Sequence, residues 1–329
     1  MTIRRSVSLY SFQQAYYTGR QTLKQLLEKT SQVVGSPGVE LIPEQMPVGS
    51  FPDPSEAAVD EWKGWLAEYK LTPTCMDSFI DTMLYKDRFL TLKEQVAQME
   101  RDLKLARRLG FPVIRVLCPI RKEIVEASLD IAAKYDVKMG LEIHAPMTIR
   151  SRWITEYMEM VRKTGSKHAG LIIDFSIFQM RPPRKMLDNA RKAGSKPEIL
   201  DRICALQEAH RSVGEMMADI GRLGGGEVER GVAMSLARSA FSEPEWLRDY
   251  PAYLFHCHGK FIEMDEACNE TAIDYVTPFR ILKEIGYDGW VSSEYEGQRL
   301  YTGAEEADEI EQVRRHHVMM KRLIGGSTK

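Results

Sequence analysis

Residues 137–175 read VKMGLEIHAPMTIRSRWITEYMEMVRKTGSKHAGLIIDF, and this stretch indicates the fold. It opens with a β-rich run that ends near His144, continues with an amphipathic stretch over about 152–164, and returns to a β-rich run over 169–175. Short apolar strands that alternate with helices are typical of βα units, which build parallel sheets. The stretch therefore predicts a strand, a helix and a second strand parallel to the first.

The same alternation extends outward along the chain in both directions. We predict eight strands, over residues 5–10, 38–43, 71–77, 111–117, 137–144, 169–175, 252–258 and 289–296. Helices are expected over about 19–34, 55–69, 91–109, 121–135, 152–164 and 305–323. Eight strand–helix repeats are the pattern of an α/β protein of the (β/α)8 TIM barrel class, and we predict a single barrel domain over 1–329. A doubly wound sheet is the alternative, but no GxGxxG motif follows the first strand.

One interval between strands is too long for a simple repeat. Between Asp174 and His256 the sequence contains two or three additional helices, of which 197–220 is the clearest. We expect a helical insertion over 176–249, between strands six and seven. Because barrel insertions usually lie in the loops at the catalytic face, this one is expected to form a wall or lid of the site. A solvated excursion without a role in the site is the alternative.

Composition excludes several classes of protein. A formal net charge of -2 argues against a nucleic-acid or anionic-membrane surface, which needs a clustered basic field. No apolar run approaches the ~20 residues of a membrane span, and the N-terminal residues lack the apolar core of a signal peptide. The absence of a CxxC motif favours free thiols in a reducing compartment, so we expect a cytoplasmic enzyme or enzyme subunit. The five cysteines are Cys75, Cys118, Cys204, Cys257 and Cys268.

Ionisable side chains gather at the predicted ends of strands five to eight. Strand five ends in Glu142-Ile143-His144, and strand six ends in Asp174. Strand seven ends in HCHGK, residues 256–260, and strand eight in EYE, residues 294–296. Residues two apart share one face of a strand, and the strand ends of a barrel face the mouth where catalytic groups lie. The sequence therefore predicts one polar site at this rim.

A divalent cation is the simplest explanation for this convergence. A single buried carboxylate or histidine is more often a paired structural group than a ligand. Several together cost several kcal/mol of desolvation unless something compensates them, and a cation does so directly. Carboxylates with one imidazole suit Mn²⁺ or Mg²⁺ better than structural Zn²⁺, with Co²⁺ also open. Spacing alone does not decide whether His256 or His258 is the ligand.

The eight-strand layout, the GVELIP run at 38–43 and the series at the strand ends resemble the xylose isomerase-like barrels. The resemblance covers nearly the whole chain except roughly 176–249, and the family includes ketose 3-epimerases and inosose dehydratases and isomerases. It implies that one divalent metal, Mn²⁺ foremost, is bound and chelates adjacent sugar oxygens. It also implies that the second histidine of an HxHxK strand end is the ligand. The implied ligands are Glu142, Asp174, His258 and Glu294.

Three further segments are similar to the large (alpha) subunit of bacterial C-glycoside deglycosidases. They are LEIHAP at 141–146, FHCHGKF at 255–261 and SSEYEG at 292–297. This resemblance implies a metal-dependent carbon–carbon lyase that cleaves the bond between an aromatic aglycone and a 3-oxo sugar. It also implies a hetero-oligomer with a small β-rich second subunit. Neither a nucleic acid nor a membrane is expected as a partner.

The implied reaction suggests roles for individual residues. The metal, held in part by Glu142 and Glu294, would polarise the C3 ketone and acidify the proton at C2, and a base would remove that proton before the C1–aryl bond breaks. His144 is our candidate base, because imidazole titrates near neutrality. In the alternative, His144 only hydrogen-bonds to Glu142 and orients it. The expected substrate contacts are Tyr10, His256, Lys260 and Glu296, of which Lys260 or Glu296 would orient a hydroxyl or help to protonate the leaving carbon.

Other functions remain open at this stage. A ketose 3-epimerase would use Glu142 and Glu294 to exchange a proton across the two faces of C3. A barrel without chemistry would be a scaffold subunit, although the presence of all four ligands argues against it. An apurinic endonuclease is disfavoured, because the chain has only seven histidines and is not basic.

A pair of histidines lies away from the predicted site. His316 and His317 occupy the last predicted helix among basic residues. We expect them on a solvated helix face rather than in a second metal site.

Overall fold

Eight parallel strands close into a barrel, in the order of the sequence, with β8 paired to β1. The computed structural model describes residues 2–117, 120–238, 241–301 and 306–325. The strands are β1 (Arg4–Ser8), β2 (Gly38–Leu41), β3 (Thr72–Ser78), β4 (Val113–Val116), β5 (Lys138–Ile143), β6 (Ala169–Asp174), β7 (Leu254–Phe261) and β8 (Trp290–Tyr295). The predicted (β/α)8 TIM barrel is confirmed.

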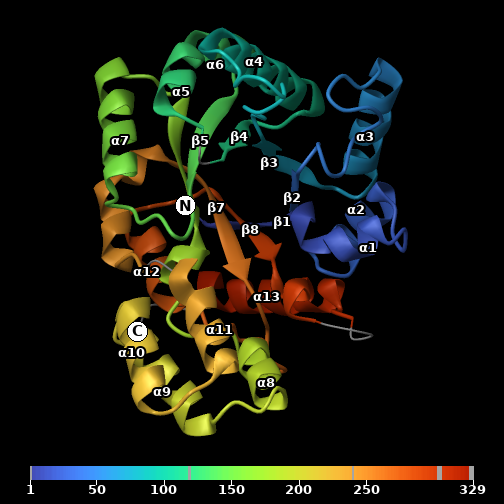
Figure 1. Cartoon of the computed structure of the whole chain (residues 1–329). Coiled ribbons are helices and arrows are strands. Elements are labelled where there is room, and N and C mark those ends of the chain that lie inside the picture. Colours follow the sequence, from blue (N-terminus) through green and yellow to red (C-terminus); the bar gives the residue numbers. More distant parts are fainter. Residues whose placement is uncertain (1, 118–119, 239–240, 302–305, 326–329) are drawn as a thin grey trace.

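Helices surround this barrel and cover its outer face (Figure 1). They are α1 (Gln13–Tyr17), α2 (Leu23–Gln32), α3 (Glu56–Glu68), α4 (Leu92–Leu109), α5 (Lys122–Ala127), α6 (Leu129–Tyr135), α7 (Arg152–Thr164), α12 (Val276–Glu284) and α13 (Glu309–Gly325). The helix expected over 121–135 is in fact the pair α5 and α6. The break is at Ser128. Its hydroxyl donates a hydrogen bond to the carbonyl of Ile124, and such a side-chain bond competes with the backbone hydrogen bonds of a helix.

Local sequence signals explain how individual helices begin and end. At the start of α4, Thr91 accepts a hydrogen bond from the backbone N–H of Glu94, and the Glu94 side chain accepts one from the backbone N–H of Thr91. This reciprocal cap satisfies two of the amides that a helix start leaves free. The helix ends at Gly110, whose φ of 92° lies in the left-handed region that glycine adopts without strain. The chain then turns directly into β4.

The register of the last strands brings the candidate site residues into adjacent positions. Asp174 on β6 pairs with His258 on β7, and Lys260 on β7 pairs with Glu294 on β8. Paired residues on neighbouring strands lie only about 5 Å apart, so their side chains meet when they point to the same face. The barrel therefore positions these side chains through backbone hydrogen bonds rather than through flexible loops.

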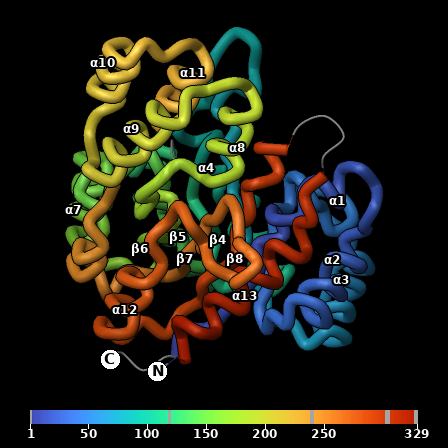
Figure 2. The backbone as a smooth tube through the Cα atoms, turned by 90° about the horizontal axis from the view of Figure 1, so that it is seen from below, coloured from blue at the N-terminus to red at the C-terminus, as the bar shows by residue number. Residues whose placement is uncertain are grey.

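Four α-helices lie between β6 and β7 in the described part of the chain, more than the two or three expected. They are α8 (Arg184–Lys192), α9 (Pro197–Glu208), α10 (Val213–Arg222) and α11 (Glu227–Ser235). The single helix expected over 197–220 divides into α9 and α10, because His210 adopts a φ of 52° and Ser212 caps a new helix with Glu215. The four helices gather at one end of the barrel in both views (Figures 1 and 2).

These helices share a small apolar core of their own, separate from that of the barrel. It is formed by side chains from each helix, among them Ala190, Ile203, Met216, Ile220 and Val232. Burial of apolar side chains against one another is the main source of stability in such a unit. The boundaries 176 and 249 remain a prediction.

The last helix corrects one expectation. His316 and His317 are buried, so the prediction of a solvated face was wrong. His316 Nδ1 lies 2.7 Å from Ser293 Oγ, and His317 Nδ1 lies 3.2 Å from Arg5 Nη1. Val313 and Met320 are buried on the same side of α13. The spacing 313, 316, 317 and 320 is the i, i+3, i+4, i+7 stripe of a core-facing helix, which the charged neighbours obscured.

No disulfide forms among the described cysteines. Cys75, Cys204, Cys257 and Cys268 are free thiols, and Cys118 lies outside the described residues. Among the described helices, none combines the length and the apolar character needed to cross a membrane.

Candidate metal and substrate site

Four predicted ligands meet at the carboxyl end of the barrel. Glu142, Asp174, His258 and Glu294 come from β5, β6, β7 and β8, and all four are buried. One ligand atom from each lies within 4.8 Å of the ligand atoms of the others. The structure therefore brings the whole predicted set together in the geometry of one small ion site.

The imidazole of His258 lies between carboxylates on both of its edges. Its Nδ1 is 2.6 Å from Glu142 Oε1 and 3.3 Å from Glu294 Oε2. Its Nε2 is 3.3 Å from Glu40 Oε2 on β2. Nδ1 thus faces the ligand cluster, while Glu40 lies on the opposite edge of the ring. The Glu40 contact is an ion-pair distance and not a hydrogen bond, so Glu40 acts on the ring through its charge.

The cluster has unused acceptor capacity that a cation would fill. Asp174 Oδ2 and Glu294 Oε2 are buried and form no hydrogen bond with the described residues. Their nearest positive groups are Lys260 Nζ, 3.4 Å from Asp174 Oδ2, and His258 Nδ1, 3.3 Å from Glu294 Oε2. Buried carboxylate oxygens without partners are destabilising, and three carboxylates with one imidazole form a donor set for a divalent cation. The residues present therefore fit the metal that the sequence predicts.

The charges around the cluster keep two of its carboxylates ionised. Burial favours the neutral form of Glu142, but Arg115 and His258 outweigh it and hold the pKa of Glu142 below its ordinary value. Burial is likewise outweighed at Glu294, where Lys260 and His258 lower the pKa to about 2. At Asp174 burial prevails over Lys260 and raises the pKa to about 6.

Sequence reasoning missed three charged residues of this site. Arg115 on β4 is buried, with Nη1 3.1 Å from Glu142 Oε2 and Nε 2.9 Å from Asp77 Oδ1 on β3. Burial raises the pKa of Asp77 to about 8, despite the opposing effect of Arg115. Glu40 lies at the other edge of the cluster. Arg115 and Glu40 each interrupt an apolar strand run, FPVIRVL and GVELIP, and a charge in such a run was the signal that could have identified them.

A cavity of about 510 Å³ opens above the cluster. Its walls include Tyr10, Glu142, His144, Asp174, Lys260, Glu294 and Glu296, which are predicted site residues. Lys260 Nζ lies 3.1 Å from Glu294 Oε1 and 3.0 Å from Glu296 Oε1. The Tyr10 hydroxyl donates to Glu296 Oε1 at 2.9 Å. The structure thus joins three of the four predicted substrate contacts, through one hydrogen bond and one ion pair, in a row beside the ligands.

His144 also lies on the cavity wall, just beyond the end of β5. Its Nδ1 is 2.7 Å from the carbonyl oxygen of Ala145, which cannot donate a hydrogen bond. We therefore assign the proton to Nδ1, which leaves the lone pair on Nε2. The described contacts include no hydrogen bond from His144 to Glu142, which the orienting alternative requires.

His256 does not occupy the expected position in the cavity wall. It is fully buried, and its Nε2 lies 2.8 Å from both Glu40 Oε2 and Ser292 Oγ. Two residues back along a strand place a side chain about 6–7 Å deeper in the barrel, which explains why His256 lies below His258. The expected substrate contact is therefore corrected to a contact with Glu40.

The stretch between β6 and β7 contributes to the wall of the cavity. Gln179, which follows β6, and Ser235, the last residue of α11, both line it. This placement agrees with the expectation that the stretch forms part of the wall of the site. It does not agree with the alternative of a solvated excursion that has no role in the site.

Comparison with known proteins identifies a family and relatives that agree with one another. Residues 28–322 match the family described as xylose isomerase-like TIM barrel. The 3'-dehydrocarminate deglycosidase alpha subunit of Microbacterium sp is 28% identical over 337 residues, covering 98% of this chain and 95% of the relative. A C-glycoside deglycosidase alpha subunit of Arthrobacter globiformis is 29% identical over 345 residues, covering 98% and 92%.

A solved structure of D-psicose 3-epimerase with D-tagatose, from Clostridium cellulolyticum H10, has a TM-score of 0.59. It is 14% identical, and the match covers 98% of this chain and 99% of that one. At that identity the likeness concerns the fold alone. The family match spans most of the sequence, and the closed barrel agrees with it. This chain therefore belongs to the xylose isomerase-like TIM barrel family.

Proposed function

We propose that this chain is the catalytic subunit of a C-glycoside deglycosidase, a metal-dependent carbon–carbon lyase that acts on 3-oxo-C-glycosides. The observation that carries the proposal is the four-ligand cluster at the base of a cavity whose wall holds His144. The names of the two relatives support the same reaction class. The free thiols support a cytoplasmic location.

The ligands in this proposal are Glu142, Asp174, His258 and Glu294, and the cation is Mn²⁺, with Mg²⁺ or Co²⁺ as alternatives. When bound, such a cation supplies a Lewis acid that polarises the C3 carbonyl of the sugar and makes the proton at C2 more acidic. Arg115 holds Glu142 in its ionised form, and the negative charge of Glu40 lies 3.3 Å from His258 Nε2, on the edge of the ring away from the cluster. These two contacts preorganise the ligands before substrate arrives.

His144 performs the proton transfers. Its Nε2 takes the proton from C2, and the electron pair of that C–H bond forms a C1=C2 double bond as the C1–aryl bond breaks. The electron pair of the broken bond stays on the aromatic carbon, which takes the proton back from the His144 imidazolium. The reaction thus releases the protonated aglycone and an unsaturated sugar, with no net gain or loss of protons or electrons.

Lys260 lies where it can orient the substrate. Its Nζ is on the cavity wall, 3.0 Å from Glu296 Oε1 and 3.1 Å from Glu294 Oε1. We propose that Lys260, together with Glu296 and Tyr10, binds sugar hydroxyls.

The experiment is an assay of aglycone release from a 3-oxo-C-glycoside, followed by chromatography. The protein should be purified from its own cells with any polypeptide that accompanies it, and then loaded with Mn²⁺. Release that stops on chelation and returns with Mn²⁺ supports the proposal. No release by the metal-loaded protein contradicts it.

A ketose 3-epimerase is the second candidate function. It is favoured by the placement of Glu142 and Glu294, both within the one cluster and both on the cavity wall, because an epimerase needs a carboxylate on each face of the reacting carbon. Exchange of the C3 proton of a free ketose with solvent deuterium, in the absence of any aglycone, would identify this activity.

We also propose a small β-rich second subunit, since both relatives are named alpha subunits. Exposed apolar side chains gather in segment 83–92, which leads from the loop after β3 into the first residue of α4, namely Met83, Leu84, Tyr85, Phe89 and Leu92. The helices between β6 and β7 expose only Leu223 and Met234 among their described large apolar residues. Exposed apolar side chains that lie close together in the chain favour an interaction surface, so we propose segment 83–92 as the binding surface for the partner.

A further inference from the structure

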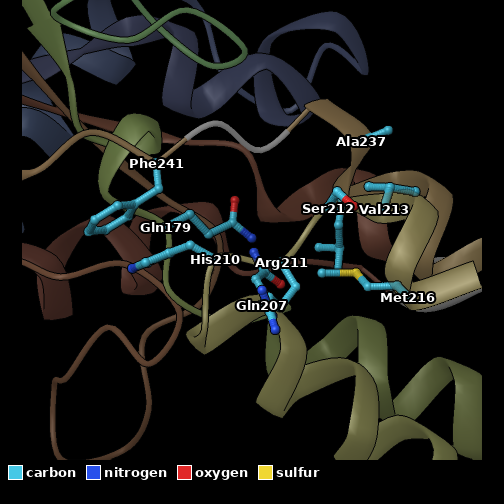
Figure 3. A pocket seen from close by; sticks show the side chains of 10 residues that line it. Gln179, Gln207, His210, Arg211, Ser212, Val213, Met216, Ala237 and Phe241 are labelled. Carbon is cyan, nitrogen blue, oxygen red and sulfur yellow. The ribbon is translucent and has the colours of Figure 1, made fainter. Parts of the chain in front are cut away.

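A second cavity, of about 400 Å³, lies among the helices between β6 and β7. Figure 3 shows the side chains that line it. They come from the end of α9, the start of α10 and the segment after α11, and include Gln207, His210, Met216, Leu236 and Phe241. The cavity is a separate space from the one above the metal ligands, and the proposed chemistry makes no use of it.

The two cavities adjoin one another. Gln179 lines both of them. Ser235 lines the cavity above the ligands, and the next residue, Leu236, lines the second cavity. To reach the second cavity, a molecule held at the ligand cluster would have to pass Gln179.

The second cavity contains a buried polar side chain that lacks a partner. Gln207, in the last turn of α9, is only 6% exposed. Neither its amide nitrogen nor its amide oxygen forms a hydrogen bond with the described residues. A buried amide without partners destabilises a folded protein, and most buried polar groups are therefore paired. A ligand with a hydroxyl or carbonyl group in this cavity would satisfy Gln207.

The cavity also offers a flat aromatic surface. The rings of His210 and Phe241 are stacked, with centroids 3.7 Å apart and planes inclined by 18° (Figure 3). His210 is held in this position with a φ of 52°, which is uncommon for a residue other than glycine. Met216 and Leu236 add apolar surface. Aromatic ligands stack on such rings and pack against such side chains.

We propose that the second cavity binds the aromatic aglycone of the substrate, while its sugar occupies the ligand cluster. Gln207 recognises a ring hydroxyl or carbonyl, and the His210–Phe241 stack packs against the ring. This inference rests on the proposed function, because it assigns the leaving group of that reaction to a place in the protein.

The first test measures binding of a free aromatic probe, 4',5,7-trihydroxyflavone, by isothermal titration calorimetry. Gln207→Leu keeps a similar volume but removes the amide, so flavone binding should weaken about five- to tenfold, the value of one or two hydrogen bonds. Without flavone, the same variant should melt at a higher temperature than the wild type, because it removes an unpaired buried amide. A structural role for Gln207 would instead lower the melting temperature.

Ser195→Ala is the matched control. Ser195 is also buried among these helices, its hydroxyl has no hydrogen-bond partner among the described residues, and it does not line the cavity. Its substitution should leave flavone binding unchanged. Absence of flavone binding to the wild type, or equal affinity in Gln207→Leu, would overturn the inference.

The second test separates this inference from the proposed function. With a 3-oxo-C-glycoside of the same flavone, Gln207→Leu should raise KM about five- to tenfold while metal content stays unchanged. If the wild type cleaves the glycoside and Gln207→Leu has the same KM, the proposed deglycosidase activity is supported and the proposed aglycone site is contradicted. If the wild type binds flavone through Gln207 but does not cleave the glycoside, the cavity is supported as a site for aromatic ligands and the proposed reaction is contradicted.

Discussion

The Nδ1 atom of His258 lies 2.6 Å from Oε1 of Glu142, so that an imidazole from β7 meets a carboxylate from β5 at the mouth of the barrel. Both side chains are buried, and Glu294 approaches the same nitrogen at 3.3 Å. Such a contact concentrates negative charge around one ring nitrogen. A divalent cation bound among these groups would replace a proton on that nitrogen, so metal binding should release protons.

Metal binding should stabilise the protein through these ligands. We expect Mn²⁺ to raise the melting temperature of the wild type, because a ligand that binds only the folded state stabilises it. Glu294→Gln should show little or no increase at the same concentration, and differential scanning fluorimetry checks both. An equal shift in the variant would mean that the ion binds elsewhere.

Glu40 should act on the metal through His258. Replacing Glu40 with Gln removes the carboxylate that faces His258 Nε2 at 3.3 Å, and with it the restraint on the ring. We expect Mn²⁺ affinity to fall about ten- to a hundredfold, as is usual for such partners of ligating histidines. Calorimetric titration measures this. Unchanged affinity would show that Glu40 serves only His256.

His144 should be needed for turnover but not for metal binding. His144→Ala is expected to lower kcat about 10²- to 10⁴-fold, the usual contribution of a general base, with full metal content. Rates of aglycone release and metal analysis together provide the check. A variant that keeps its rate would remove His144 from the mechanism.

Stability should fall as the pH drops below about 6.5, in part because of His317. Burial first, and then the nearby Arg5, lower the pKa of His317 to about 3. The unfolded chain therefore binds a proton at this residue below the ordinary histidine pKa of about 6.5, while the folded protein does not. Stability from His317 is complete above that pH and is lost as pH falls toward 3, by about 2 kcal/mol at pH 5.

Urea unfolding at pH 7.5 and pH 5.0 measures this loss. His317→Gln should lose less stability between the two pH values than the wild type does, because its amide does not titrate. An identical loss in both proteins would place the pH dependence at other groups.

The partner should be lost when charge is introduced into segment 83–92. Phe89 is 68% exposed, and Phe89→Glu should prevent copurification of the second subunit without changing Mn²⁺ content. Leu223→Glu, on the exposed end of α10, is the matched control and should keep the partner. If only the Leu223 variant loses it, the partner binds the helices between β6 and β7 instead.

The sequence predicted those features that depend on periodicity and on strand ends. The alternation of apolar runs gave the barrel, because buried strands and amphipathic helices have different repeats. The residues Glu142, Asp174 and Glu294 were identified because strand ends in a barrel point to one rim. How far a side chain lies from the mouth of the barrel was harder to predict. His256 and His258 share one face of β7, and only the point at which β7 reaches the mouth decides which of them lies beside the other ligands.

Other features depend on contacts between distant strands. Arg115 and Glu40 matter because β2 and β4 bring them beside ligands from β5 and β7, and no local pattern encodes that proximity. The second cavity forms where α9 ends and α10 begins, around His210 and Ser212. Its existence depends on how four short helices pack, which periodicity does not determine.

The most direct test of the central claim is the release of aglycone from a 3-oxo-C-glycoside by the metal-loaded protein, with a free ketose in deuterated water as the parallel reaction. We predict aglycone release that requires the metal and is at least about 10²-fold slower in His144→Ala, with no deuterium incorporated at C3 of the ketose. Deuterium incorporation without aglycone release would contradict the deglycosidase and establish the epimerase in its place.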